Sequence, residues 1–203
     1  ADEILSLLRA GTAAERVGIV CEAVDRWRGP LAAVLGPLGV PYAIEEPLRL
    51  DRSPLGRALV SLLRFAWLGG GRGDLFAFLR SPFSGLPRAS VDYLEGRLRG
   101  RAVREPARVL ETLEKLRGAP LEQLDVLRAA RSPLAGVRDV AGRLLPGAYG
   151  LVRPPLSETA RADLRAFEAL QRVLEELADW EERAGPLRPE DVVAAIEQAS
   201  IPS

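Results

Sequence analysis

At 203 residues, the chain is long enough to bury a sizeable core in one or two domains. Its 28 basic and 28 acidic residues give a net charge of zero, which excludes a uniformly basic nucleic-acid coat and confines any DNA contact to a local patch. Histidine is absent and Cys21 is the single cysteine, which excludes Ser-His-Asp triads, histidine-ligated zinc and internal disulfides.

The first fifty residues predict a short helix followed by a small β-α-β unit. The helix is expected over Asp2–Arg9, the first strand over Val17–Val20, the second helix over Arg26–Leu38 and the second strand over Val40–Ile44. Parallel strands are normally covered by helices on both faces, which one β-α-β unit cannot provide. We therefore expect this segment to be part of a larger α/β domain, with the apolar residues of its two strands poorly covered.

The rest of the chain reads as helix after helix. Ser53-Pro54 is a strong signal for a helix start, because serine caps the first turn and proline is favoured at the first helical position. Helices are expected over residues 53–67, 75–80, 90–98, 106–116, 121–130, 133–145, 157–183 and 189–199. The predicted fold class is mainly α, with a β-α-β stub over residues 1–50 and a multi-helix subdomain over residues 51–203.

The chemistry of a catalytic site is missing from the pattern. No G-x-x-x-x-G-K-[ST] loop occurs, and neighbouring glutamates such as Glu175-Glu176 point to different sides of a helix. We expect no catalytic residue, no metal site and no cofactor in this chain.

No run of about 18 apolar residues occurs, so no membrane partner is expected. Without a visible signal peptide, the expected location is the cytoplasm. Methionine is absent, and we expect the sequence to be part of a longer chain.

Several short motifs follow one another in a familiar order. The apolar run Val17–Cys21 and the helix Arg26–Leu38 lead into the step Gly39-Val40-Pro41-Tyr42. They are followed by Ser53-Pro54-Leu55-Gly56-Arg57-Ala58-Leu59 and by DLFAFLRSPF over residues 74–83. In this order the motifs, which lie within residues 1–86, resemble the UvrD-like superfamily 1 DNA helicases, and among them the helicase–nuclease subunits of the AddAB and RecBCD type.

That resemblance implies a fold and a function. Residues 1–50 would be a stub of a RecA-like motor domain, and residues 51–203 a helical accessory insertion subdomain. The parent would be an ATP-dependent DNA helicase or exonuclease subunit, a hydrolase of DNA repair and recombination that uses ATP and Mg. Its partners would be DNA, the remaining motor domains and a second helicase–nuclease subunit. Arg26 or Arg28 would reach the nucleotide γ-phosphate. Glu22 stands where members of the family often have an arginine, and this replacement fits equally well a subunit whose motor domain no longer binds ATP.

The densest basic cluster suggests where DNA would be held. It comprises Arg97, Arg99, Arg101, Arg104 and Arg108. Guanidinium groups near a loop can hold phosphates without reading bases. The competing interpretation is an ordinary helix surface in which these arginines pair with Glu95, Glu105 and Glu111. The alternative function is a helical protein–protein interaction scaffold without DNA binding, and a third is a stand-alone helical regulator.

Overall fold

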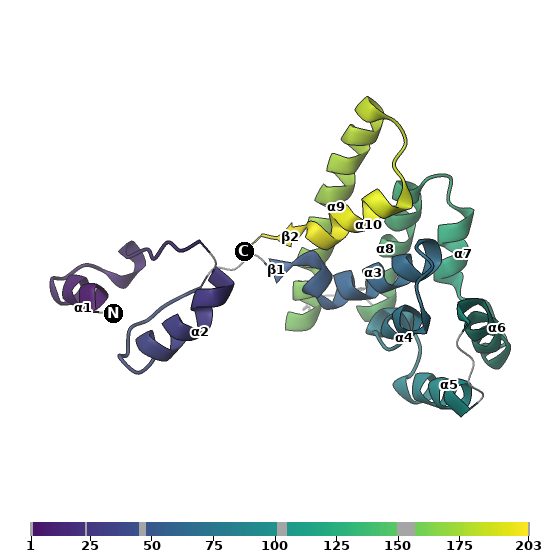
Figure 1. Ribbon diagram of the computed structural model, residues 1–203, viewed down its shortest axis with the longest axis horizontal. Coiled ribbons are helices and arrows are strands. Elements are labelled where there is room, and N and C mark those ends of the chain that lie inside the picture. The colour runs from purple at the N-terminus through teal and green to yellow at the C-terminus, as the bar shows by residue number, and fades with distance from the viewer. Residues whose placement is uncertain (1, 23, 45–47, 101–104, 150–156, 203) are drawn as a thin grey trace. The chain divides into compact units, whose positions relative to one another are not determined.

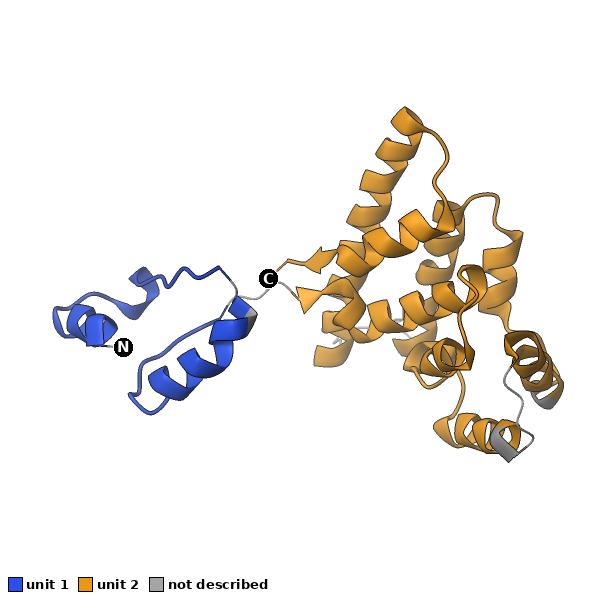
Figure 2. Ribbon diagram, in the orientation of Figure 1, with its two compact units in different colours: residues 1–47, 203 blue, residues 48–202 orange. Residues whose placement is uncertain are grey.

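The computed structural model describes residues 2–22, 24–44, 48–100, 105–149 and 157–202. It divides into two compact units, unit 1 with residues 1–47 and Ser203, and unit 2 with residues 48–202 (Figure 2). The chain is mainly helical (Figure 1), which confirms the coarse fold class predicted from the sequence.

Unit 1 contains two helices and a short turn of 3-10 helix. They are α1 (Asp2–Arg9), η1 (Ala14–Arg16) and α2 (Val24–Leu35). α1 has the predicted bounds, whereas α2 begins and ends earlier than predicted. Gly39 follows α2 with a φ of 65°, a conformation that glycine adopts at little cost, and thereby turns the chain.

The predicted β-α-β arrangement is not formed in the part of unit 1 that the structure describes. Residues 17–20 and 40–44 have no regular secondary structure and no strand partner. A strand exists only where a neighbour completes its hydrogen-bond ladder. The apolar runs therefore predicted burial correctly at Val40, which is 8% exposed, but their prediction of paired strands was wrong for the described residues.

Unit 2 begins and ends with a strand and contains the remaining helices. In chain order these are β1 (Leu48–Arg49), η2 (Leu50–Arg52), α3 (Pro54–Trp67), α4 (Arg72–Leu79), η3 (Pro82–Ser84), α5 (Arg88–Gly100), α6 (Pro106–Arg117), α7 (Glu122–Ala129), α8 (Pro133–Tyr149), α9 (Glu158–Ala184), α10 (Pro189–Gln198) and β2 (Ser200–Ile201). Each predicted helix after residue 53 has a counterpart here, with bounds that differ by a few residues.

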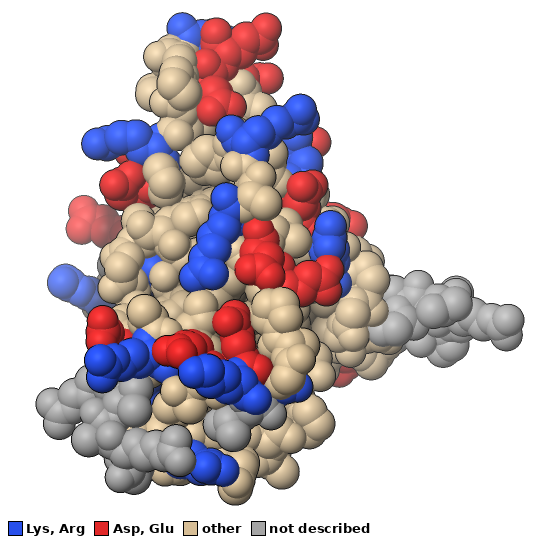
Figure 3. Space-filling view, turned by 90° about the vertical axis from the view of Figure 1, so that its right-hand side faces the viewer, with Lys and Arg blue, Asp and Glu red and all other residues tan. Residues whose placement is uncertain are grey.

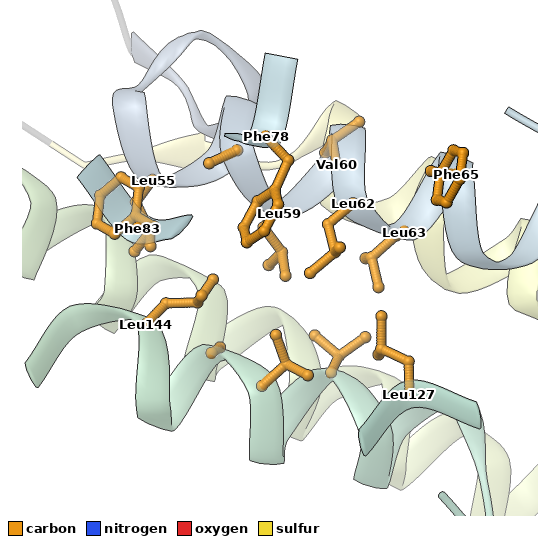
Figure 4. Packing of buried hydrophobic residues seen from close by; sticks show 14 of the residues in the cluster. Leu55, Leu59, Val60, Leu62, Leu63, Phe65, Phe78, Phe83, Leu127 and Leu144 are labelled. Atoms are coloured by element: carbon orange, nitrogen blue, oxygen red, sulfur yellow. The ribbon is translucent and has the colours of Figure 1, made fainter. Parts of the chain in front are cut away.

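Helix α3 is the centre of the unit 2 core. It packs against α4, α7, α9 and α10, and it buries side chains on almost every side. A helix that is apolar on several faces is stable only when other helices surround it. Figure 4 shows Leu59, Leu62 and Leu63 of α3 pointing toward the layer that carries Leu127 of α7 and Leu144 of α8.

The start of α3 is held by polar groups from two parts of the chain. Ser53 caps the helix, because its Oγ accepts the Gly56 N–H at 3.0 Å. The Leu55 N–H donates to Oδ1 of Asp163, a fully buried residue on α9, at 3.1 Å. Asp163 also accepts the hydroxyl of Tyr149 from α8. This carboxylate therefore ties α3, α8 and α9 together at the positive end of the α3 dipole.

The two ends of unit 2 lie side by side. β1 and β2 pair antiparallel, with Leu48 opposite Ile201 and Arg49 opposite Ser200. The Leu50 N–H adds a bond of 2.8 Å to the Ala199 carbonyl. The chain therefore leaves unit 2 at the point where it entered, which the sequence analysis did not predict.

Candidate nucleic-acid interface

The arginines of the predicted DNA cluster fall around the end of α5 and the start of α6. Arg97 and Arg99 belong to α5, and Arg108 belongs to α6, which packs against α5 (Figure 1). Arg101 and Arg104 lie outside the described residues, as does the side chain of Arg99. The structure thus places three of the five predicted arginines on two neighbouring helices.

The described arginines of this cluster have local partners. The Arg108 Nε lies 3.3 Å from a carboxylate oxygen of Glu105, and both side chains are largely exposed. The Arg97 Nη1 donates to the Tyr93 hydroxyl at 3.0 Å. An exposed ion pair contributes little to stability and is screened by salt, so it can be exchanged for a phosphate contact.

The acidic residues of α5 form ion pairs with arginines of α4, of the residue that follows α4 and of α5 itself. Glu95 forms ion pairs with Arg80 and with Arg72, the latter at 3.8 Å. The Asp92 carboxylate lies 3.8 Å from Arg80 and 3.9 Å from Arg88. Glu105 pairs with Arg108, as the competing interpretation expected, whereas the side chains of Arg99, Arg101 and Arg104, with which Glu95 could also pair, lie outside the described residues.

The charge on this side of unit 2 is mixed. Figure 3 shows Lys and Arg alternating with Asp and Glu over most of the displayed face. Acidic side chains gather at the top of Figure 3, where α9 ends. The displayed face thus carries charges of both signs, as expected for a chain with zero net charge.

The predicted nucleotide-binding residues Arg26 and Arg28 lie in the first turns of α2, in unit 1, and are exposed. The resemblance implied that one of the two reaches a γ-phosphate, and this role stays a prediction. Trp27 between them is 53% exposed.

Unit 1 also carries an open apolar groove of about 610 Å³. Its walls come from α1, from α2 and from the segments that were predicted as strands; they include Leu8, Val17, Ile19, Leu31, Leu35 and Tyr42. Among the described residues of unit 1, only Leu35 and Val40 are buried, whereas Val20 is 99% exposed. The expectation of poorly covered apolar residues is thus met at Ile19, Val20 and Tyr42 but not at Val40.

A second cleft, in unit 2, is smaller and partly bridged. It measures about 320 Å³ and lies between η3, α7 and α8. The Arg143 Nη1 and a Glu122 oxygen, 2.6 Å apart, belong to its walls. Its only charged lining side chains satisfy each other, so it offers no reactive group.

Neither a metal centre nor a membrane span is found in the described ranges. No group of three or more His, Cys, Asp and Glu side chains is arranged to hold a metal ion in these residues. No helix within these residues combines the length and the apolar character that a bilayer span requires.

Comparison of the chain with protein-family models, curated proteins and solved structures found no significant match.

Proposed function

We propose that this chain is the accessory region of a UvrD-like superfamily 1 DNA motor, of the kind found in AddAB- and RecBCD-type helicase–nuclease subunits. Unit 2 is the helical insertion that handles DNA, and unit 1 is a segment of the RecA-like motor domain. The parent would hydrolyse ATP with Mg during DNA repair and recombination. This chain alone would bind DNA and catalyse nothing.

The observation that carries the proposal is the pairing of the two ends of unit 2. Because β1 and β2 are adjacent and antiparallel, the first and the last described residues of unit 2 lie side by side. A module of this kind can be inserted into a connection of another domain without disturbing that domain. This geometry supports the insertion subdomain that the motif order implied.

The exposed apolar surface of unit 1 supports the second half of the proposal. Two buried side chains among the described residues of unit 1 are too few to hold α1 and α2 as an independent domain. A larger α/β body would cover the groove, and residues 17–20 and 40–44 would gain strand partners on its sheet. Unit 1 would then be the part of the motor from which unit 2 departs.

The contact with DNA is assigned to α5 and α6. Arg97 and Arg108 are exposed there, and Arg101 and Arg104 follow α5 in the sequence. The acidic end of α9 would repel phosphates and thereby confine DNA to this part of unit 2.

Salt-dependent binding tests this assignment. A duplex with a single-stranded overhang is titrated with the chain at several salt concentrations, and binding is followed by fluorescence anisotropy. Arg97→Ala and Arg108→Ala should each lower the slope of log K against log salt by about 0.7–0.9, according to whether the lost phosphate contact is to single- or double-stranded DNA. Arg188→Ala is the matched control, because Arg188 is an exposed arginine that pairs with Asp191 at 3.0 Å, as Arg108 pairs with Glu105. Binding that is equally weakened by all three variants would contradict the assignment.

The protein–protein scaffold is the second candidate, and one observation favours it. Trp27 and Val34 are 53% and 47% exposed on α2 and lie seven residues apart, on one side of the helix. Exposed aromatic and aliphatic side chains in a row are typical of a protein interface. If the chain bound no DNA at low salt, the scaffold would replace the DNA motor as the proposed function.

A further inference from the structure

The outer side of α5 carries an exposed tyrosine beside an arginine. Tyr93 is 59% exposed, and its hydroxyl accepts a hydrogen bond of 3.0 Å from Arg97, one turn further along the helix. The Arg97 guanidinium carbon lies 5.7 Å from the centre of the Tyr93 ring. The ring and the cation are therefore held together at the surface, where a ligand can reach both.

The two acidic residues of α5 that border this side are directed elsewhere. Asp92 and Glu95 pair with arginines at positions 72, 80 and 88. On a helix, positions 92 and 95 lie away from the line that joins positions 93 and 97. The charged group that lies over the Tyr93 ring is the Arg97 guanidinium.

A glycine keeps the helix surface beside Tyr93 bare. Gly96 is exposed and lies one turn from Tyr93, and a Cβ added to it would meet no atom within 4 Å. Packing therefore does not require glycine at this position, although glycine in a helix costs about 1 kcal/mol relative to alanine. Gly96 therefore leaves the helix surface next to the Tyr93 ring uncovered, and this surface is called the open flank.

We propose that Tyr93 and Arg97 form a stacking platform for an unpaired base of single-stranded nucleic acid, with Arg97 also contacting the neighbouring phosphate. The inference rests on the proposed DNA-binding function and names the part of the DNA that α5 holds. Exposed aromatic rings with adjacent arginines bind unpaired bases without strong sequence preference. A base inside a duplex has both faces covered by its neighbours and cannot use such a ring.

The test compares a single-stranded oligothymidylate with a blunt duplex. Tyr93→Ala should raise the Kd for the single strand about 5- to 150-fold, the range found for loss of one stacked base. It should leave the Kd for the blunt duplex and the salt slope unchanged, because no phosphate contact is lost. Arg97→Ala should instead lower the single-strand salt slope by about 0.7. Tyr93→Phe should bind as the native chain does, and Tyr42→Ala is the control for loss of another exposed tyrosine.

A second variant keeps the test decisive if Tyr93→Ala loses helical structure. Gly96→Gln places a side chain over the open flank and should weaken single-strand binding, whereas Gly142→Gln, at an exposed and equally uncrowded helix position of α8, should not. Unchanged single-strand binding by Tyr93→Ala and Gly96→Gln would overturn the platform and leave the proposed function standing. Equal losses on single strand and blunt duplex would also overturn it. No binding of any DNA by the native chain would overturn both proposals.

Discussion

The buried carboxylate of Asp163 gives the sharpest test of how unit 2 is held together. It accepts the Leu55 N–H at the start of α3 and the Tyr149 hydroxyl at the end of α8, and it is fully buried. In Asp163→Ala both donors lose their acceptor, and Leu55 is itself fully buried.

The expected cost follows from these two contacts. An unsatisfied buried N–H costs about 1–3 kcal/mol, and loss of the Tyr149 hydrogen bond about 0.5–1.5 kcal/mol. Removal of a negative charge from a helix N-terminus adds about 0.3–1 kcal/mol. Asp163→Ala should therefore lower the free energy of unfolding by about 2–5 kcal/mol. Asp163→Asn keeps an oxygen acceptor and should cost less.

Urea denaturation followed by circular dichroism measures this loss. The denaturation slope should stay constant while the midpoint falls, and Tyr149→Phe should show a smaller effect. In a double-mutant cycle, Tyr149→Phe should cost less in the Asp163→Ala background than in the native chain, because their shared hydrogen bond can be lost only once. A change within about 0.5 kcal/mol for Asp163→Ala, the range of neutral surface substitutions, would refute the reasoning.

Three further outcomes are expected from the structure. Gly56→Ala should destabilise unit 2 by about 3 kcal/mol or more, because the added Cβ would lie 1.8 Å from the Leu50 carbonyl oxygen. Gly96→Ala should instead stabilise unit 2 by about 0.5–1 kcal/mol, because the added Cβ meets no atom within 4 Å. Thermal melts of the two variants measure both effects. Burial, and then the hydrogen bond to the neighbouring carboxylate, raise the pKa of Tyr149, so the folded chain keeps a proton that the unfolded chain loses above about pH 10. The free energy of unfolding should therefore fall more steeply with rising pH above about 10 in the native chain than in Tyr149→Phe, as urea titrations at several pH values would show. Residues 48–202 expressed alone should unfold cooperatively at the same urea midpoint as unit 2 in the whole chain, because the core cluster lies entirely within them; a lost or much lower midpoint would contradict this.

Local signals explain why most of the helices could be predicted. Ser53-Pro54 signals the start of α3 through the capping side chain of Ser53 and the fixed backbone of Pro54, both of which can be read from the local sequence. Asp74 shows the limit of such signals. The sequence predicted a helix over residues 75–80, but α4 begins at Arg72, and the Asp74 carboxylate accepts the Gly71 N–H at 2.9 Å from within its first turn.

Contacts between distant residues explain what could not be predicted. β1 and β2 have two residues each, and their pairing joins Leu48 to Ile201. Asp163 reads as one more polar residue on a helix, because its partner Leu55 is 108 positions away. The apolar runs of residues 17–20 and 40–44 indicated burial, but whether they pair depends on neighbours that the runs do not specify.

Part of the candidate nucleic-acid interface could be predicted from the sequence and part could not. The arginine cluster is visible as composition, but Tyr93 was overlooked although its spacing of four residues to Arg97 on a helix was a usable signal. The pairing of Glu95 with Arg72 and Arg80 depends on how α4 and α5 meet, and no local pattern reveals that.

The central claim is that unit 2 is stable alone, whereas unit 1 needs a larger domain to cover it. Amide hydrogen exchange on the whole chain, measured by mass spectrometry, tests this claim most directly. The amides of α3, α9 and α10 should exchange only through global unfolding of unit 2. Those of α1 and α2 should exchange far faster, because only Leu35 and Val40 are buried among the described residues of unit 1. Equal protection of α2 and α3 would contradict the account, since it would show that unit 1 is a stable domain in its own right.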